Sequence, residues 1–215
     1  MKKILVVLDM QNDFIDGPLG TPEARVIVDN VCAKIREGEW DNIIFTMDTH
    51  SEKDYSRTQE GKKLPALHCI KDSDGWKLND DIYNALQSTI PIYESHKDEL
   101  VGLKKDRFGS YALANTIEHL WDFVEDGTEL TLVGVCTDIC VISNALLLKA
   151  HFPEMKIVVD ASCCAGSTPE KHYMALEVMK SCQVDVVNNE WDELKKNITN
   201  VVGKTFGVPL GLLEE

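Results

Sequence analysis

Short apolar runs alternate with longer amphipathic stretches along the chain, and this alternation predicts a parallel α/β fold. The runs are rich in Val, Ile and Leu, which is typical of strands covered by helices on both faces. The predicted strands span residues 4–9, 42–48, 92–94, 130–135, 156–160 and 184–187. The predicted helices span residues 24–36, 111–124, 138–150 and 169–180. The helix over 138–150 is apolar almost all round, so we expect it to be buried.

Two long segments, residues 51–76 and 95–110, fit neither pattern because they are polar and contain Gly or Pro. Loops longer than about 12–15 residues inside a compact domain are usually functional. No internal repeat or linker divides the 215 residues, which predicts a single domain over residues 1–215. Residues 195–215 are weakly patterned, and we expect this C-terminal tail to wrap a surface or a partner subunit.

The charge of the chain narrows the class of protein. Acidic residues outnumber basic ones by 36 to 22, and the formal net charge is −14, which disfavours a free-standing nucleic-acid binder. No stretch approaches the ~20 apolar residues that span a bilayer, and the apolar run near Met1 is too short for a signal peptide. We expect a cytoplasmic homo-oligomer that acts on a small molecule, with neither a nucleic acid nor a membrane as partner.

The seven cysteines follow no recognisable disulfide or zinc-binding pattern. Their number is odd, their spacing is irregular and no Cys-x-x-Cys pair occurs. These features disfavour a secreted disulfide framework and a four-cysteine zinc site. We expect most of the cysteines to be small buried residues, so the question is whether one of them is a nucleophile.

Three predicted strands lead into residues that can carry out chemistry. Asp9 ends the first strand, Asp48 ends the second and Cys140 follows the fourth. In open parallel sheets, ligands bind beyond the carboxyl ends of the strands. We therefore expect these side chains, together with His50, to converge on one edge of the sheet.

Cys140 is a candidate nucleophile, because Thr137 is a suitable N-cap that would place Cys140 in the first turn of a helix. The positive end of a helix lowers the pKa of a thiol, and its N–H groups can hold an oxyanion. A buried core cysteine is the alternative. Asp9 is a candidate acid or base for the thiol, or a carboxylate that caps a loop. Lys105, taken alone, would be a surface lysine.

Asp48 and His50 lie two residues apart on an extended segment, so both side chains can reach one ion. His68, across the first long segment, would be a third ligand. One carboxylate and two imidazoles suit a divalent ion such as zinc, iron or manganese. An Asp-x-His sequence also occurs at ordinary strand ends, so the spacing alone is weak evidence.

Other common sites lack their motifs. The chain has no Gly-x-Gly-x-x-Gly after the first strand, no Gly-x-x-x-x-Gly-Lys-Ser/Thr and no Gly-x-Ser-x-Gly sequence. Dinucleotide, nucleoside triphosphate and serine-hydrolase sites are therefore disfavoured.

Five segments together make the chain similar to the isochorismatase-like cysteine hydrolases, and most similar to the nicotinamidases (pyrazinamidases). The segments are V-L-D-M-Q-N-D-F at 7–14, D-T-H at 48–50, H-C at 68–69 with Gly75, K-D-R-F at 105–108 and G-V-C-T-D-I-C-V at 134–141. Any one of them would be weak, but all five occur in the order that the family has. The resemblance covers residues 3–190 and implies a three-layer αβα fold with a six-stranded parallel sheet.

The resemblance also implies roles for particular residues. The catalytic triad would be Asp9, Lys105 and Cys140. The metal ligands would be Asp48, His50 and His68. The residues expected to contact the substrate are Phe14, Val135 and Cys136. Phe14 could pack on the substrate ring or equally be a core residue, because it follows a strand.

Two further features come with the resemblance. A cis peptide bond would join Val135 and Cys136 and turn the N–H groups of Cys136 and Cys140 toward an oxyanion. A fourth protein ligand found in some members has no clear counterpart here, and Glu60 is a guess.

The implied activity is hydrolysis of nicotinamide or pyrazinamide through a cysteine thioester. The implied cofactor is one divalent ion, with zinc expected and iron or manganese as alternatives. Residues 63–68 depart from the family, because they lack the aromatic residue and the Pro-Pro pair that are common before the metal histidine. This departure bears on the substrate rather than on the chemistry. The alternatives are another cysteine amidohydrolase, acting on a carbamoyl or ureido compound, and a non-catalytic ligand-binding member.

Overall fold

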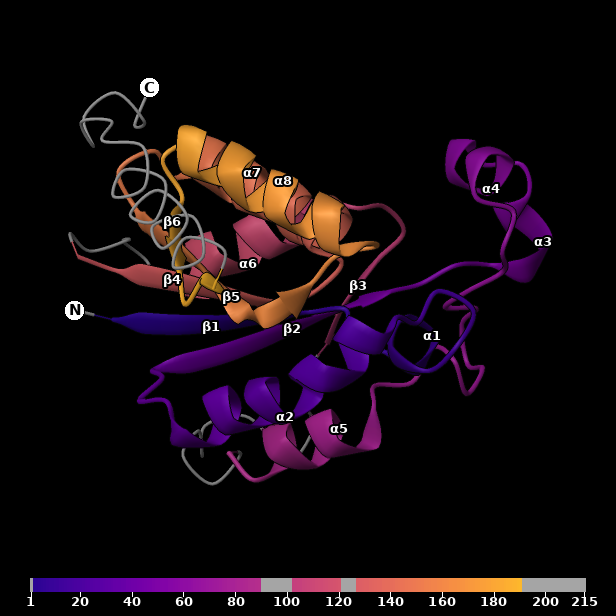
Figure 1. The fold of residues 1–215 in the computed structure, drawn as a ribbon, viewed down its shortest axis with the longest axis horizontal. Helices are drawn as coiled ribbons and strands as arrows, with labels where there is room; N and C mark the ends of the chain where they lie inside the picture. The colour runs from indigo at the N-terminus through magenta and orange to yellow at the C-terminus, as the bar shows by residue number, and fades with distance from the viewer. Residues whose placement is uncertain (1, 90–101, 121–126, 191–215) are drawn as a thin grey trace, which may run out of the picture.

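The computed structural model describes residues 2–89, 102–120 and 127–190 (Figure 1). Its centre is a six-stranded parallel sheet with the order β3-β2-β1-β4-β5-β6. The strands are β1 (Lys3–Leu8), β2 (Asn42–Asp48), β3 (Gly102–Lys105), β4 (Glu129–Val135), β5 (Lys156–Ala165) and β6 (Asp185–Val187). The described helices are α1 (Asn12–Ile15), α2 (Pro22–Glu37), α3 (Glu52–Tyr55), α4 (Gln59–Lys63), α5 (Asp80–Gln87), α6 (Tyr111–Leu120), α7 (Ile142–His151) and α8 (Pro169–Ser181).

The sheet is the middle of three layers, because successive residues of each strand face opposite sides. On β1, Leu5 and Val7 pack into one hydrophobic core with residues of α2 and α5. Ile4, Val6 and Leu8 pack into a second core with residues of α6, α7 and α8. Figure 1 shows the same arrangement, with α2 and α5 on one side of the sheet and α6, α7 and α8 on the other. The predicted three-layer αβα fold is confirmed.

Five of the predicted strands correspond to strands of the sheet, whereas the prediction for the third needs a correction. The segment 92–94 lies outside the described residues. Strand β3 lies at Gly102–Lys105, within a segment that we expected to be irregular. This edge strand of the described sheet is short and carries two lysines, so it lacks the apolar run by which a buried strand is identified.

The helix predicted over 138–150 also differs from the expectation. The chain after β4 first forms a π-helical turn, Thr137–Val141, and only then α7. Burial is one-sided, since Ala145 and Leu148 are buried while Ile142 and Leu147 are only partly buried. The cause is the position of α7 in an outer layer, where one face packs against the sheet.

Gly134 allows β4 to approach β1 closely near the carboxyl edge of the sheet. Its φ is +120°, and a Cβ atom at this position would collide with the carbonyl oxygen of Leu8. The pairing of β4 with β5 shifts register between Leu132 and Gly134. A side chain here would separate the two strands that lead to Asp9 and Cys140.

An ion pair between Asp160 and Lys34 joins β5 to α2. Asp160 is fully buried, and its Oδ2 lies 2.6 Å from Nζ of Lys34. Ser162 donates to Oδ1 through its N–H and its hydroxyl, and Asn188 donates to Oδ2. Burial acts to raise the pKa of Asp160, but these donors outweigh it and hold the pKa below its usual range.

We predict that Asp160→Asn lowers the free energy of unfolding near neutral pH by about 1–3 kcal/mol, because a charge-assisted hydrogen bond is lost. The folded-state pKa of Asp160 is lowered, so its contribution is complete above about pH 4 and is lost as the pH falls through the folded-state pKa. Urea unfolding of both proteins across this range measures the difference. Asp185→Asn is the control, because Asp185 is exposed. A loss of unfolding free energy in Asp160→Asn that grows as the pH falls would contradict the prediction.

Candidate active site and metal cluster

The candidate site lies at the carboxyl edge of the sheet, where β1 and β4 are neighbours. The chain leaves β1 toward α2 on one face of the sheet and leaves β4 toward α7 on the other. In open parallel sheets, ligands bind at such a point, where neighbouring strands lead to opposite faces. Asp9 follows β1, and Cys140 lies in the π turn after β4. Asp48 and Lys105 are register partners at the ends of β2 and β3. The structure thus brings together strand ends that are far apart in sequence.

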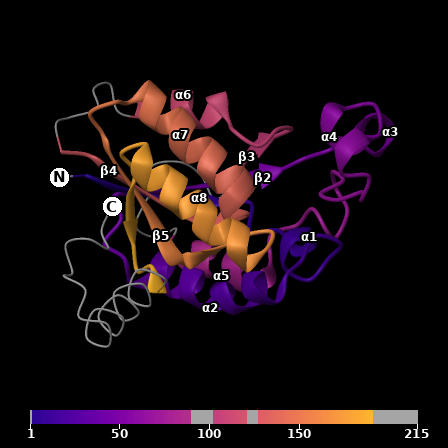
Figure 2. The same cartoon turned by 45° about the horizontal axis from the view of Figure 1, so that its top comes forward.

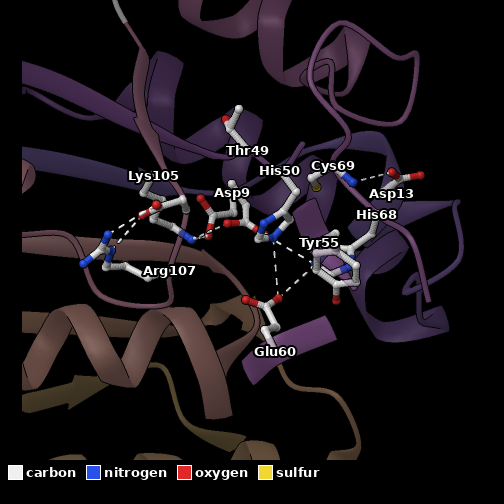
Figure 3. Close-up of polar contacts among 12 residues, drawn as sticks. Asp9, Asp13, Thr49, His50, Tyr55, Glu60, His68, Cys69, Lys105 and Arg107 are labelled. Carbon is white, nitrogen blue, oxygen red and sulfur yellow. Dashed lines mark hydrogen bonds and ion pairs between the residues drawn. The ribbon is translucent and has the colours of Figure 1, made fainter. Parts of the chain in front are cut away.

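Lys105 is at the centre of a buried charged group (Figure 3). Its Nζ lies 2.7 Å from Oδ2 of Asp9 and 3.4 Å from Oδ1 of Asp48. The same ammonium donates to the sulfur of Cys140 at 3.4 Å. Thr46 donates its hydroxyl to the other oxygen of Asp9 at 2.7 Å. Lys105 is only 6% exposed, so it is not the surface lysine that its sequence context alone suggested.

Burial and mutual charge shift the pKa values of this group. Burial raises the pKa of Asp9, and the charge of Lys105 only partly offsets this effect. Burial acts against the charged form of Lys105, but Asp9, Cys140 and Asp48 raise the pKa of this lysine above its usual value. Burial and the charge of Asp9 raise the pKa of Cys140 well above that of a free thiol. These shifts favour the ammonium form of Lys105 and the protonated form of the Cys140 thiol, and they make the carboxylate of Asp9 more basic than that of an exposed aspartate.

Two expectations for the turn that carries Cys140 are wrong. Thr137 is not the N-cap; its hydroxyl pairs with Nδ1 of His172 at 2.8 Å, and the N-cap position belongs to Cys136 without a side-chain cap. The pKa of Cys140 is raised rather than lowered. Burial and the nearby carboxylate of Asp9 outweigh the favourable field of a helix terminus, which is short-ranged.

The peptide bond between Val135 and Cys136 is cis, as the resemblance implied. Both residues are buried. The carbonyl of Cys136 accepts hydrogen bonds from the N–H groups of Ile139 and Val141, at 3.0 Å and 3.1 Å. These bonds hold the turn that presents Cys140. The oxyanion-binding role of the Cys136 and Cys140 N–H groups stays a prediction.

A second cluster adjoins the first and contains Asp48, His50, Glu60 and His68. Nε2 of His50 lies 2.8 Å from Asp48 and 3.5 Å from Glu60. Nε2 of His68 lies 3.5 Å from Asp48 and 3.3 Å from Glu60. Figure 3 shows both imidazoles pointing toward the carboxylate of Glu60. One ligand atom from each of the four residues lies within 4.8 Å of the others.

This donor set fits a divalent metal ion. Two imidazole nitrogens and two carboxylate oxygens suit zinc, iron or manganese. Nδ1 of His68 contacts the carbonyl of Ala66 at 2.9 Å, which directs Nε2 toward the cluster. Glu60, for which the sequence offered no more than a guess, is in position to be the fourth ligand.

The carboxylates of the cluster also govern the protonation of its imidazoles. Burial acts to lower both pKa values, but the hydrogen bonds to Asp48 and Glu60 raise the pKa of His50 to about 9 and that of His68 to about 10. A cation that binds here must therefore displace imidazole protons.

Phe14 and the segment around Cys69 support the histidine side of the site. Phe14 lies in α1, is buried, and has its ring centroid 5.5 Å from that of His68. The carboxylate of Asp13 accepts a hydrogen bond from the N–H of Cys69 at 2.7 Å, as Figure 3 shows. These contacts from α1 hold His68 in place. The substrate-binding role of Phe14, Val135 and Cys136 stays a prediction.

Sequence reasoning missed three buried side chains that position the site. Thr46 orients Asp9, as described above. Gln11 accepts a hydrogen bond from the N–H of Asp48 and donates to its carbonyl oxygen, at 2.7 Å and 2.9 Å. Asn144 donates to the carbonyl of Cys140 at 2.8 Å and links its helix to the loop after Lys105 through Phe108 and Ser110.

Local spacing could have identified these residues. Thr46 is two residues before Asp48 on β2, and alternation places both side chains on the same side of the strand. Asn144 lies four residues after Cys140, one helical turn further on, and is a polar residue in an apolar stretch. Gln11 belongs to the quoted motif around Asp9, but no role was assigned to it.

None of the described helices combines the length and the apolar composition of a membrane-spanning helix.

The chain is similar to known proteins both in sequence and in fold. A family model described as the Isochorismatase domain matches residues 3–190. The chain is 30% identical over 183 residues to the uncharacterized isochorismatase family protein PncA of Bacillus subtilis (strain 168). The match covers 82% of this chain and 93% of that relative.

Solved structures show the same relationship. The crystal structure of nicotinamidase/pyrazinamidase PncA from Bacillus subtilis has 27% sequence identity and a TM-score of 0.66, and the match covers 86% of this chain and 99% of that one. The pyrazinamidase of Pyrococcus horikoshii in complex with zinc shares the fold, with 23% identity, a TM-score of 0.65, and coverage of 88% and 100%. The family match over most of the chain, together with this fold, shows that the protein belongs to the isochorismatase family.

Proposed function

We propose that the protein is a nicotinamidase-like amidohydrolase that converts nicotinamide or pyrazinamide to the acid and ammonia. The observation that carries this proposal is the buried contact of Lys105 Nζ with both Asp9, at 2.7 Å, and the sulfur of Cys140, at 3.4 Å. A thiol, a carboxylate and an ammonium in one group supply a nucleophile, a proton acceptor and a fixed positive charge. The name of the Bacillus subtilis nicotinamidase/pyrazinamidase structure supports the substrate class.

In the proposed acylation step, the sulfur of Cys140 attacks the amide carbon while its proton passes to Asp9. The raised pKa of Asp9 makes this carboxylate a better base than an exposed aspartate. The ammonium of Lys105 stabilises the thiolate as it forms. Asp9 then gives the proton to the amide nitrogen, the C–N bond breaks, and ammonia leaves a thioester on Cys140.

In the proposed deacylation step, Asp9 accepts a proton from a water molecule that attacks the thioester. The C–S bond breaks, the acid is released and Cys140 regains a proton. In both steps the N–H groups of Cys136 and Cys140 are the proposed donors to the oxyanion, and preorganised donors of this kind stabilise the developing charge. Phe14 and Val135 are the proposed walls of the substrate pocket.

The residues that would hold one divalent ion are Asp48, His50, Glu60 and His68. Zinc is the expected ion, and iron and manganese are the alternatives. Such an ion supplies a Lewis acid that binds a ring nitrogen or activates water. Two carboxylates balance its double positive charge, so the cluster suits a neutral ring nitrogen better than an anion. The name of the Pyrococcus horikoshii relative, a pyrazinamidase in complex with zinc, supports zinc.

The other expectations from the sequence stay predictions. They are the homo-oligomeric state, the cytoplasmic location and the absence of nucleic-acid and membrane partners. The single domain over residues 1–215 is also a prediction, and its tail over 195–215 lies outside the described residues.

We predict that Cys140→Ala lowers ammonia release from nicotinamide by about a thousandfold or more, as loss of a catalytic nucleophile does elsewhere. The matched control is Cys32→Ala, since Cys32 is also buried but lies in α2. Activity that survives in Cys140→Ala would remove this thiol from the mechanism. An intact fold without turnover of any amide in the wild-type protein would favour a non-catalytic binding role.

We predict that Asp9→Asn and Lys105→Met each lower kcat by about a hundredfold or more, and that the double variant is little worse than either one. The reason is that the two side chains act as one buried unit, so the loss of either disables both. Steady-state kinetics and thermal unfolding of the three variants provide the measurement. Independent, multiplicative losses would show that the two residues do not act together.

We predict that His68→Ala lowers the bound zinc measured by elemental analysis, because one of four ligands is lost. His119→Ala is the control, since His119 is exposed. Chelation of the wild-type protein should raise the KM for nicotinamide and reduce its preference for nicotinamide over benzamide, which lacks the ring nitrogen. Equal hydrolysis of both amides by the untreated protein would favour the broader cysteine amidohydrolase function.

A further inference from the structure

Tyr55 is a buried residue in a segment that is otherwise largely exposed. Residues 51–67, here called the arm, carry α3 and α4, and both Figure 1 and Figure 2 show these helices extending away from the sheet and the other helices. Tyr55 is 2% exposed, whereas residues 51–54 and 56–59 on either side of it are exposed. A large side chain buried at the base of an exposed arm is expected to have a specific partner.

The ring of Tyr55 packs against both imidazoles of the metal cluster. Its centroid lies 4.9 Å from that of His50 and 5.3 Å from that of His68, and both contacts are edge-on. The two imidazole centroids are 5.0 Å apart, also edge-on. Three rings in mutual contact leave little freedom for rotation about the side-chain torsions of either histidine. The ring of Tyr55 therefore restricts the direction in which each Nε2 points.

The hydroxyl and backbone of Tyr55 hold the helix that carries Glu60. The hydroxyl donates to the carbonyl of Leu64 at 2.8 Å, and Leu64 is the C-cap of α4. The carbonyl of Tyr55 accepts hydrogen bonds from the N–H and the hydroxyl of Thr58, the N-cap of α4. A Cβ atom on Gly61 would collide with the same carbonyl, so α4 lies directly against Tyr55. One residue thus contacts both ends of α4.

We propose that Tyr55 is a positioning residue for the metal ligands. Its ring orients His50 and His68 from one side, and its hydroxyl fixes α4 so that Glu60 reaches both imidazoles from the other. Side chains that hold metal ligands in this way tune metal affinity without touching the ion. This inference rests on the proposed metal site, but its test does not depend on catalysis.

The test is the dissociation constant for Zn²⁺, measured by competition with a chromogenic chelator. Tyr55→Phe keeps the ring and removes only the hydroxyl, and we expect affinity to fall about threefold to tenfold, as for loss of one hydrogen bond. Tyr55→Leu also removes the ring, and we expect a loss of about ten- to a hundredfold. Tyr83→Phe is the matched control, because Tyr83 is exposed on α5 and its hydroxyl contacts Gln87.

A double-mutant cycle distinguishes positioning from a general structural effect. If the hydroxyl acts through Glu60, Tyr55→Phe weakens Zn²⁺ binding in the wild-type background and has no further effect in the Glu60→Ala background. Equal losses in both backgrounds, or unchanged affinity in Tyr55→Phe, would overturn the role assigned to the hydroxyl. Unchanged affinity in Tyr55→Leu would overturn the role of the ring.

Two further measurements complete the experiment. Thermal unfolding without metal shows whether each variant keeps its fold. If Tyr55→Leu does not fold, the affinity of Tyr55→Phe for Zn²⁺ decides whether Tyr55 positions the metal ligands. Failure of the wild-type protein to bind Zn²⁺ would overturn both this inference and the metal half of the proposed function. Zn²⁺ binding that is indifferent to Tyr55 would overturn the inference alone.

Discussion

The buried ion pair between Asp9 and Lys105 is the interaction on which the rest of the site depends. A single charge in this position would be costly, because moving an unpaired ion out of water carries a large desolvation penalty. The ammonium of Lys105 also lies within 3.4 Å of both Asp48 and the Cys140 sulfur. One positive charge therefore joins the thiol side of the site to the side that carries the candidate metal-binding cluster. Loss of either partner of the pair would leave a buried charge without its nearest counter-charge.

The sheet makes this concentration of charge possible. Parallel strands deliver Asp9, Asp48 and Lys105 to one edge, while helices cover both faces of the sheet. Buried polar side chains then supply hydrogen bonds to groups near the charges. Gln11 pairs with both backbone groups of Asp48, and Thr46 pairs with the carboxylate oxygen of Asp9 that does not face Lys105. The site is thus held by the core of the fold rather than by surface loops alone.

The same burial explains why simple rules for isolated groups fail here. A cysteine in the first turn of a helix is ordinarily expected to have a lowered thiol pKa, yet burial and Asp9 raise the pKa of Cys140. A lysine among polar residues is ordinarily exposed, yet Lys105 is held inside by carboxylates that raise its pKa. In the proposed mechanism the resting thiol becomes nucleophilic only as its proton moves to Asp9.

Much of the fold and part of the site could be predicted from local patterns. Continuous apolar runs identified five strands, because a strand buried on both faces needs apolar residues at nearly every position. The rule for strand ends then grouped Asp9, Asp48 and Cys140 at one edge. Three features were decided by the tertiary structure. Edge strand β3 lacks an apolar run, Glu60 reaches the cluster from an arm whose path has no local signature, and the pKa of Cys140 depends on burial and on charges from distant strands. Each of these depends on contacts between residues far apart in the sequence, and hydrophobic periodicity reports only on neighbours.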